Sequence, residues 1–283
     1  MKVDWQGRLF PAAYGPPPMT TAARTRALVT LRQRVLDALE ADGVAVLSPL
    51  RADVSLGLCA ELDLGATLCM LDPWYNKGFG GLEDDAAYDA ALLRLLAHAA
   101  RLVDHTYLWG FPEIVARLIG RFPEPLRLEA WLTWFYKNNP SVIRGWRSAQ
   151  NACLHLVRPG ATMHPEHFMN EAQKAKQAEG KLRYLPGPPS VIEAGLLVGF
   201  IGRNEQTGHP SQKPEAVYRP LVEMATVAGD LVIDPMAGSG TTGAVCRALG
   251  RRAVLCDGSA DYIALIEHRL DVRRIRVPVV LSR

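Results

Sequence analysis

The sequence predicts an α/β protein built on an open, mostly parallel, twisted sheet with a small insertion. First, short apolar runs typical of strands covered on both faces alternate with helical segments, from residue 44 to 157 and again from 214 to 270. Second, two of these runs end in loops rich in reactive residue types, at 72–76 and 234–243. Third, clear periodicity is lost over residues 160–208, which indicates an insertion or a small second lobe.

The first part of the chain, residues 1–43, is expected to form an irregular arm followed by a helix. Gly15 and the three prolines after it cannot lie inside a helix. Between Leu28 and Leu39, leucine and valine recur at spacings of three and four, which places them on one helical face.

The remaining elements follow from the same two periods. Strands are expected at 44–47, 66–71, 105–109, 128–135, 151–157, 231–234 and 253–257. Helices are expected at 84–102, 113–119, 171–179, 215–226, 241–249 and 261–270. Ligands of open parallel sheets bind beyond the carboxyl ends of the strands, so the loops after 71 and 234 are the candidate site.

Composition narrows the class of protein without choosing a function. The chain has 283 residues, is 48% hydrophobic and 22% charged, and carries a net charge of +3, which suits a folded protein and permits a polyanionic partner. No apolar stretch is long enough for a membrane helix, and the start lacks the apolar region of a signal peptide. The 5 cysteines form no CxxC pair, so we expect a reduced, cytoplasmic protein without a cysteine metal site.

The loop at 234–243 reads D-P-M-A-G-S-G-T-T-G and runs from a strand into a helix. Gly238 and Gly240 let backbone N–H groups approach a ligand, and the new helix offers further unpaired donors. Asp257, after the following strand, can accept hydrogen bonds from a ribose diol. The loop alone fits both a nicotinamide dinucleotide and S-adenosylmethionine. Asp234 favours the second, because it can meet an ammonium group whereas it would repel a pyrophosphate.

The loop at 72–76 reads D-P-W-Y-N and follows the strand expected at 66–71. It combines the carboxylate of Asp72, the carbonyl of Pro73 and two adjacent aromatic side chains. This set suits an exocyclic amine on a planar ring, because the aromatic group can stack on the ring while both acceptors take the amine hydrogens. Such hydrogen bonds localise the nitrogen lone pair, which can then attack an adjacent sulfonium methyl group. Taken alone, the loop fits an ordinary Asp-Pro turn equally well.

Three segments in this order resemble the β-class DNA amino-methyltransferases: D-P-W-Y-N at 72–76, H-P-S-Q-K-P at 209–214 and the glycine loop at 234–243. The resemblance covers most of residues 44–270 by element order. It implies a Rossmann-like methyltransferase fold that uses S-adenosylmethionine, DNA as a partner, a flipped target base and a restriction-modification context. It also implies a catalytic half at 44–140, a target-recognition region at 141–208 and a cofactor-binding half at 209–283. A homodimer without membrane contact is expected.

The resemblance also assigns the expected site residues. Those expected to act in catalysis are Asp72, Pro73, Trp74 and Tyr75. Those expected to bind S-adenosylmethionine are Ser211, Lys213, Asp234, Pro235, Met236, Ala237, Gly238, Gly240, Thr241, Thr242 and Asp257, with Asp53 near its adenine. Those expected to contact DNA are Arg144, Arg147, Lys174, Lys176, Lys181, Arg183 and Arg203. Departures from the family pattern stand at Trp74, Met236 and Ser259, where Pro, Phe and Asp are usual.

The reaction expected is methylation of an amine, because the sequence has no Pro-Cys dipeptide of the kind that a cytosine-carbon methyltransferase needs. By the resemblance, Asp72 favours adenine N6, and cytosine N4 is the alternative within the class. A nicotinamide-dependent oxidoreductase and a catalytically weak DNA-binding protein are the more distant alternatives. No metal site is expected: His164 and His167 have the spacing of a ligand pair, but Pro165 and the lack of further ligands favour an ordinary loop.

Overall fold

The computed structural model describes residues 2–3, 9–10, 21–75, 84–139, 145–185 and 187–282. Asn76 and Arg144, both singled out from the sequence, lie outside them. The strands are β1 Lys2–Val3, β2 Leu9–Phe10, β3 Val44–Val46, β4 Leu68–Leu71, β5 His105–Gly110, β6 Arg127–Phe135, β7 Gln150–Val157, β8 Val191–Glu193, β9 Leu231–Asp234 and β10 Arg252–Leu255. The helices are α1 Thr21–Asp42, α2 Ala52–Leu62, α3 Asp85–Leu102, α4 Pro112–Ala116, α5 Glu171–Ala178, α6 Glu215–Ala225, α7 Thr241–Ala248 and α8 Ala260–Leu270, with the 3-10 helices η1 Pro165–Phe168 and η2 Val279–Leu281.

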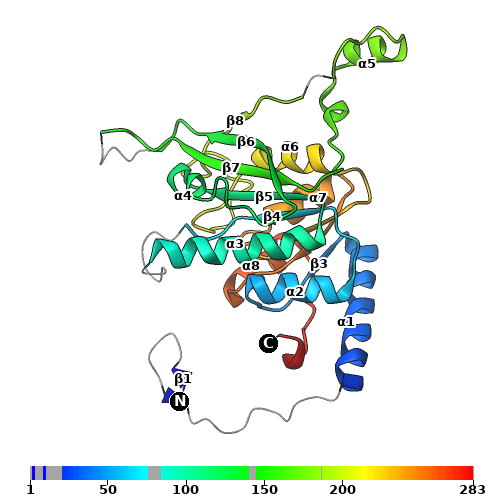
Figure 1. Ribbon diagram of the computed structural model, residues 1–283, viewed down its shortest axis with the longest axis vertical. Coiled ribbons are helices and arrows are strands. Elements are labelled where there is room, and N and C mark those ends of the chain that lie inside the picture. The colour runs from blue at the N-terminus through cyan, green and yellow to red at the C-terminus, as the bar shows by residue number, and fades with distance from the viewer. Residues whose placement is uncertain are drawn as a thin grey trace.

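A mostly parallel sheet forms the centre of the molecule (Figure 1). It contains 8 strands in the order β3-β10-β9-β4-β5-β7-β6-β8. The run from β3 to β5 is parallel throughout, and β7 is antiparallel to both of its neighbours. The predicted open α/β sheet is therefore confirmed.

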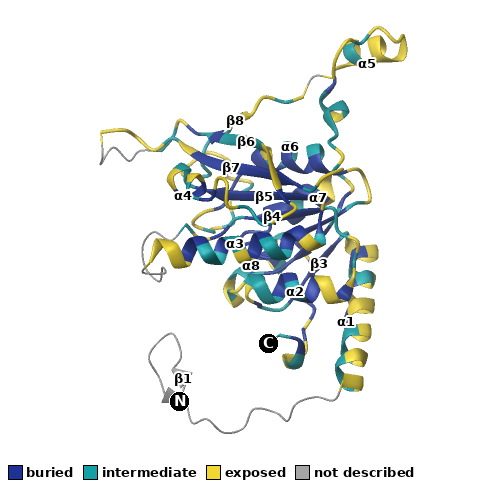
Figure 2. Cartoon of the chain, viewed as in Figure 1, coloured by how far each residue is buried: buried dark blue, intermediate teal, exposed yellow. Residues whose placement is uncertain are grey.

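Helices cover both faces of the sheet. Strand residues alternate between two apolar clusters: Cys69 and Leu71 pack with α1, α2 and α3, whereas Leu68 and Met70 pack with α6, α7 and α8. This alternation explains why the strands read as continuous apolar runs, since neither face is exposed to water. Figure 2 shows the result as buried strands flanked by helices whose outer surfaces are exposed.

The predicted strands and helices from residue 84 onward are present within a few residues of their expected ends. Helix α2 and strand β8 were not predicted, nor were the two-residue strands β1 and β2 in the expected arm or the short helices η1 and η2. Helix α2 has buried side chains on several sides, including Leu56, Leu58 and Cys59, and contains Gly57, so it lacks a clear helical stripe. Strand β8 has only 3 residues and pairs with β6 at the edge of the sheet, too short for any period to be visible.

The insertion expected after residue 160 does not form a separate core. Its first short helix is η1. The N–H of His164, just before η1, donates to the carbonyl of Met224 at the end of α6 (2.9 Å). Helix α5 then projects away from the body, with no buried residue (Figures 1 and 2). Strand β8 returns the chain to the sheet. None of the helices described here combines the length and the apolar content that a membrane span requires.

Candidate active site

The two loops predicted as the site lie at the same edge of the sheet. Strands β4 and β9 are parallel neighbours, so the chain leaves both at their shared carboxyl end. A cavity of about 830 Å³ opens there. From the predicted site, its lining includes Asp72, Pro73, Trp74, Tyr75, Ser211, Lys213, Pro235, Met236, Ala237, Gly238, Thr241, Thr242 and Asp257.

The carboxylate of Asp72 is held by three side chains inside this cavity. The ammonium group of Lys213 donates to both of its oxygens. The Tyr75 hydroxyl donates to Oδ1 (2.9 Å) and the Tyr218 hydroxyl to Oδ2 (3.2 Å). Each oxygen thus accepts two hydrogen bonds, which uses the full lone-pair capacity of a carboxylate.

Aromatic rings surround the Lys213–Asp72 ion pair. The Lys213 side chain is 3% exposed, and its Nζ lies 5.0 Å from the centre of the Trp109 ring and 5.2 Å from that of Tyr75. Tyr218 stacks on Trp109 at 6.0 Å. Burial raises the pKa of Tyr75 and of Tyr218 well above the usual value, so both phenols stay protonated and act as donors.

The glycine loop has a backbone that only glycine adopts without strain. Gly238 has φ of +48°, and a Cβ added there would lie 2.9 Å from Nε2 of His209. The Gly238 N–H donates to Oδ2 of Asp257 (3.0 Å), and the Ser259 N–H donates to Oδ1 (2.8 Å). Asp257 therefore fixes the loop while its half-buried carboxylate faces the cavity.

Asp234 organises the start of the same loop from beneath. Its side chain accepts hydrogen bonds from the Met236 N–H (3.0 Å) and the Thr242 hydroxyl. Burial raises its pKa to about 7. Asp234 and Gly240 do not line the cavity. Asp234 thus orients the loop, and the structure shows no contact through which its carboxylate would meet the ammonium group of a ligand.

Other predicted residues are placed less centrally. Asp53 pairs with Arg51, and it is Arg51 that lines the cavity. Ser259 caps α8 by accepting a hydrogen bond from the Tyr262 N–H (3.4 Å). The Gln212 amide bonds Thr207 and the Glu205 carbonyl, which attaches the H-P-S-Q-K-P segment to the end of the insertion.

Four residues whose contacts shape the site were given no role in the sequence analysis: Trp109, His209, Tyr218 and Arg269. Arg269 on α8 donates to the Ser239 carbonyl (3.1 Å) and to Glu215 (2.8 Å), so it links the glycine loop to the start of α6. His209 was visible in a quoted segment but was given no role. The other three lie on regular elements, where side chains of these types usually serve packing.

Those residues predicted to contact DNA that the structure describes are exposed, and they lie on the insertion and on the segment before β7. Lys174 and Lys176 lie on α5, with Lys181 and Arg183 just beyond it. Arg147 precedes β7, and the Arg203 guanidinium lies over the Phe200 ring at 4.6 Å. Large exposed aromatic side chains occur in the same region, at Trp146, Tyr184 and Phe200.

All five cysteines, Cys59, Cys69, Cys153, Cys246 and Cys256, are buried and unpaired with one another. Burial raises the pKa of each thiol, so none is poised to form a thiolate nucleophile. This agrees with methylation of an amine rather than of a ring carbon.

A family model described as "DNA methylase", for N6 and N4 enzymes, matches residues 67–268. The chain is 44% identical over 225 residues to the DNA adenine methyltransferase YhdJ of Escherichia coli (strain K12), covering 72% of this chain and 76% of that protein. This chain belongs to the N6/N4 DNA methylase family. It is also 30% identical over 146 residues to the Type II methyltransferase M.HpaI of Haemophilus parainfluenzae, a match that spans 50% of this chain and 45% of M.HpaI.

Solved structures of this family share the fold. The M1.HpyAVI–SAM complex superposes with a TM-score of 0.61 at 19% identity, covering 81% of this chain and 100% of that one. The cytosine-N4-specific PvuII DNA methyltransferase gives a TM-score of 0.58 at 16% identity, covering 81% of this chain and 88% of that one. The family and the Rossmann-like methyltransferase fold predicted from the sequence are therefore confirmed.

Proposed function

We propose that this DNA methylase transfers a methyl group from S-adenosylmethionine to N6 of an adenine flipped out of DNA. The observation that carries the proposal is the single cavity shared by the Asp72 loop and the glycine loop. The similarity to a DNA adenine methyltransferase over most of both chains supports adenine as the target.

The residues present fit S-adenosylmethionine. The cavity is within the size range of small-molecule sites, and Gly238 lines it without a side chain, at a position where a Cβ would press against His209. We assign the ribose hydroxyls to Asp257 and the amino-acid end to the segment of Ser211 and the start of α7. When bound, the cofactor supplies a methyl group on a sulfonium, whose C–S electron pair stays on sulfur. A bound nicotinamide dinucleotide would instead leave the Asp72 cluster without a chemical role.

In this proposal the adenine amine donates to Asp72. Because both oxygens already accept two hydrogen bonds, the amine must replace at least one present donor. Lys213 is the donor that bonds both oxygens, so it can give up one and keep the other. The nitrogen then gives its lone pair to the methyl carbon and releases one proton along the hydrogen bond to the carboxylate.

Trp74 is the aromatic side chain best placed to stack on the base. It is 47% exposed and lines the cavity. Tyr75, the other aromatic side chain of this loop, has its hydroxyl bound to Asp72 and its ring edge-on to Phe111 at 4.8 Å. We therefore assign Tyr75 to orienting the carboxylate and Trp74 to contacting the base.

Recognition of DNA is assigned to the insertion. Its exposed basic side chains suit phosphate contacts, and its exposed aromatic side chains suit base contacts. Helix α5 is polar on all sides and is stabilised by a capping box of Asn170 and Gln173, so it holds its shape without a core of its own. A DNA substrate is consistent with the predicted cytoplasmic location, and the homodimer stays a prediction.

The deciding experiment incubates the protein with duplex DNA and S-adenosylmethionine, digests the DNA and measures methylated nucleosides. N6-methyladenine is expected from the native protein and none from Asp72→Asn, while calorimetry finds S-adenosylmethionine bound by both. The exposed-site control Asp261→Asn should methylate normally. N4-methylcytosine as the product would establish the alternative within the class. Binding of NAD(P)H in place of S-adenosylmethionine would overturn the proposal.

A further inference from the structure

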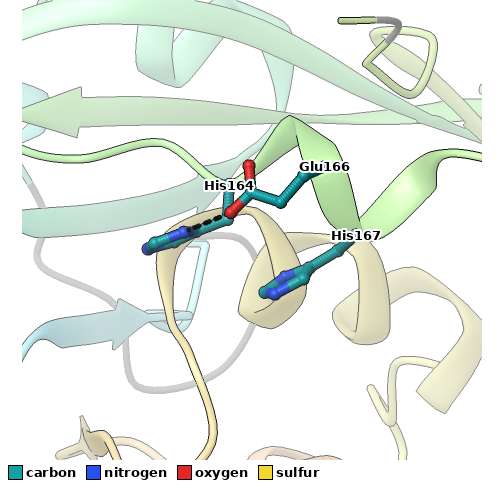
Figure 3. A group of neighbouring side chains, drawn as sticks. All are labelled: His164, Glu166 and His167. Carbon is teal, nitrogen blue, oxygen red and sulfur yellow. Dashed lines mark hydrogen bonds and ion pairs between the residues drawn. The ribbon is translucent and has the colours of Figure 1, made fainter. Parts of the chain in front are cut away.

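A second cluster of polar side chains lies outside the cavity, on the turn that precedes α5. His164 stands just before η1, and Glu166 and His167 lie within it. One ligand atom from each lies within 4.8 Å of the other two. Figure 3 shows both imidazole rings on the same side of the turn, with the Glu166 carboxylate beside His164. The sequence predicted an ordinary loop here because a third ligand was not evident.

The hydrogen bond of His167 leaves a nitrogen lone pair available. Nδ1 of His167 lies 2.7 Å from the carbonyl oxygen of Glu223. A carbonyl only accepts, so Nδ1 carries the proton and Nε2 is free to bind an ion. Metal-binding histidines are usually oriented by this kind of bond from the second ring nitrogen to a carbonyl.

The contact between His164 and Glu166 supplies the other two ligands. Nδ1 of His164 lies 2.9 Å from Oε1 of Glu166, so the imidazole and the carboxylate already form a hydrogen bond. The two imidazole rings are stacked at 5.4 Å. The side chains of His164 and Glu166 are 16% and 40% exposed, which gives an ion access from solvent.

We propose that His164, Glu166 and His167 form a zinc site. Zinc binds imidazole nitrogen and carboxylate oxygen at about 2.0–2.2 Å in tetrahedral geometry, with water completing the set. Two imidazoles favour it over magnesium, which prefers oxygen ligands. Zinc takes the place of the proton between His164 and Glu166, which moves to Nε2 of His164, and small side-chain rotations bring the three ligand atoms to bonding distance.

The site serves to anchor the root of α5. None of its three residues is among those that line the cavity, so the ion takes no part in methyl transfer. The turn is already bonded to the end of α6 through Met224 and Glu223. A bound ion would join both sides of this turn and so hold the start of the projecting helix against the body.

The test titrates zinc chloride into tag-free, chelator-treated protein and follows binding by calorimetry and by elemental analysis. One zinc per chain is expected, without displacement by magnesium chloride. His167→Asn retains a side-chain N–H near the Nδ1 position but loses the free Nε2, and His164→Asn loses the imidazole nitrogen beside Glu166. Each, like Glu166→Gln, should weaken zinc binding by roughly tenfold or more. The control His268→Asn, at an exposed histidine of α8, should bind zinc as the native protein does.

Hydrogen exchange provides the second measurement. Zinc should slow exchange in residues 160–175 of the native protein and leave that of His167→Asn unchanged, with circular dichroism showing that both are folded. The proposal is overturned if the native protein binds no zinc, if the three variants bind it like the native protein, or if the protected segment lies elsewhere. Because none of these measurements uses methyl transfer, they are independent of the proposed function.

Discussion

The Asp72 carboxylate is the residue on which the chemistry depends, and its surroundings are complete before any substrate enters. Tyr75 belongs to the same loop, whereas Lys213 and Tyr218 come from a distant segment at the start of α6, and all three donate to this group. A carboxylate held in this way is already oriented when the amine arrives, and the exchange of one donor leaves the others in place. The sequence resemblance placed Lys213 at the cofactor, whereas the structure directs its ammonium group to Asp72.

Lys213→Met separates these two roles. It removes the ammonium group but keeps an unbranched side chain among Trp109 and Tyr75. We expect kcat to fall about 10²-fold, as when a catalytic group is misplaced by about 1 Å, while the affinity for S-adenosylmethionine changes little. Calorimetry and single-turnover methylation measure the two effects. Loss of cofactor affinity with a normal kcat would instead assign Lys213 to cofactor binding. Arg26→Met, at an exposed position of α1, is the control.

Asp234 predicts how stability depends on pH. Its folded-state pKa of about 7 is above the value of 3.8 for an exposed aspartate, so between these values the folded chain binds more protons than the unfolded chain. Its contribution to stability is therefore greatest at low pH and declines as pH rises from about 4 to 7. Asp234→Asn keeps an acceptor for Met236 and removes the titration. Between pH 5 and pH 8 the Tm of the native protein should therefore fall more, or rise less, than the Tm of Asp234→Asn. Equal changes in Tm in the two proteins would contradict the argument.

At the scale of elements, the unit formed by β9, the glycine loop and α7 carries the cofactor side of the site. Its shape depends on packing as well as on backbone freedom: a Cβ on Gly243 would lie 2.7 Å from side-chain atoms of both Leu255 and Leu270. The loop therefore needs glycine at one position for its conformation and at another for the approach of α7 to the sheet.

Gly238→Ala tests the loop against a matched control. Gly238 and Gly250 both have positive φ, but a Cβ meets His209 only at Gly238 and open space at Gly250. Gly250→Ala should cost about 1 kcal/mol of unfolding free energy and leave cofactor binding intact. Gly238→Ala should also weaken S-adenosylmethionine binding, measured by calorimetry. Equal affinities in the two variants would show that the approach of His209 is not required.

Helix α5 makes its own prediction. If Lys174 and Lys176 contact phosphate, replacing both by alanine weakens DNA binding and reduces the slope of log affinity against log salt by about 1.8. Fluorescence anisotropy at several salt concentrations measures this slope. The control Arg26→Ala with Arg94→Ala removes the same charge from exposed positions on α1 and α3. An equal change in both double variants would assign the effect to net charge alone.

At the scale of the whole molecule, strand order brings the two halves of the site together. The Asp72 loop and the glycine loop are far apart in the chain, and the pairing of β4 with β9 makes them neighbours. The H-P-S-Q-K-P segment then connects the two loops. The ammonium group of Lys213 contacts Asp72, and the Lys213 carbonyl accepts a hydrogen bond from the Thr241 hydroxyl of the glycine loop (3.0 Å). Folding and site assembly are therefore one event.

Cofactor binding should consequently stabilise the whole chain. At a concentration of about 100 times Kd, S-adenosylmethionine adds about 2.7 kcal/mol, or a few degrees in Tm for a chain of this size. Scanning fluorimetry should show this increase for the native protein and for Asp72→Asn. NADH should cause no shift, and a shift with NADH alone would favour the oxidoreductase.

Sequence patterns predicted much of this architecture because strands buried on both faces and amphipathic helices leave clear periods. The loops were found because Asp72, Gly238 and Asp257 occur where strands end. The partners Trp109 and Tyr218 were not, since a buried aromatic side chain on a strand or helix has the same local pattern whether it packs or serves a site. Only the packing of α6 against β5 makes them neighbours of Lys213.

The burial of every cysteine makes the thiols of the folded chain unreactive. Thiol-directed dyes and alkylating agents find nothing to attack while the two apolar layers stay closed. Five sulfur atoms become reactive once those layers open, so labelling would mark the moment when the chain loses its structure. An oxidising environment would accordingly damage newly made or heat-stressed copies first and leave mature ones untouched.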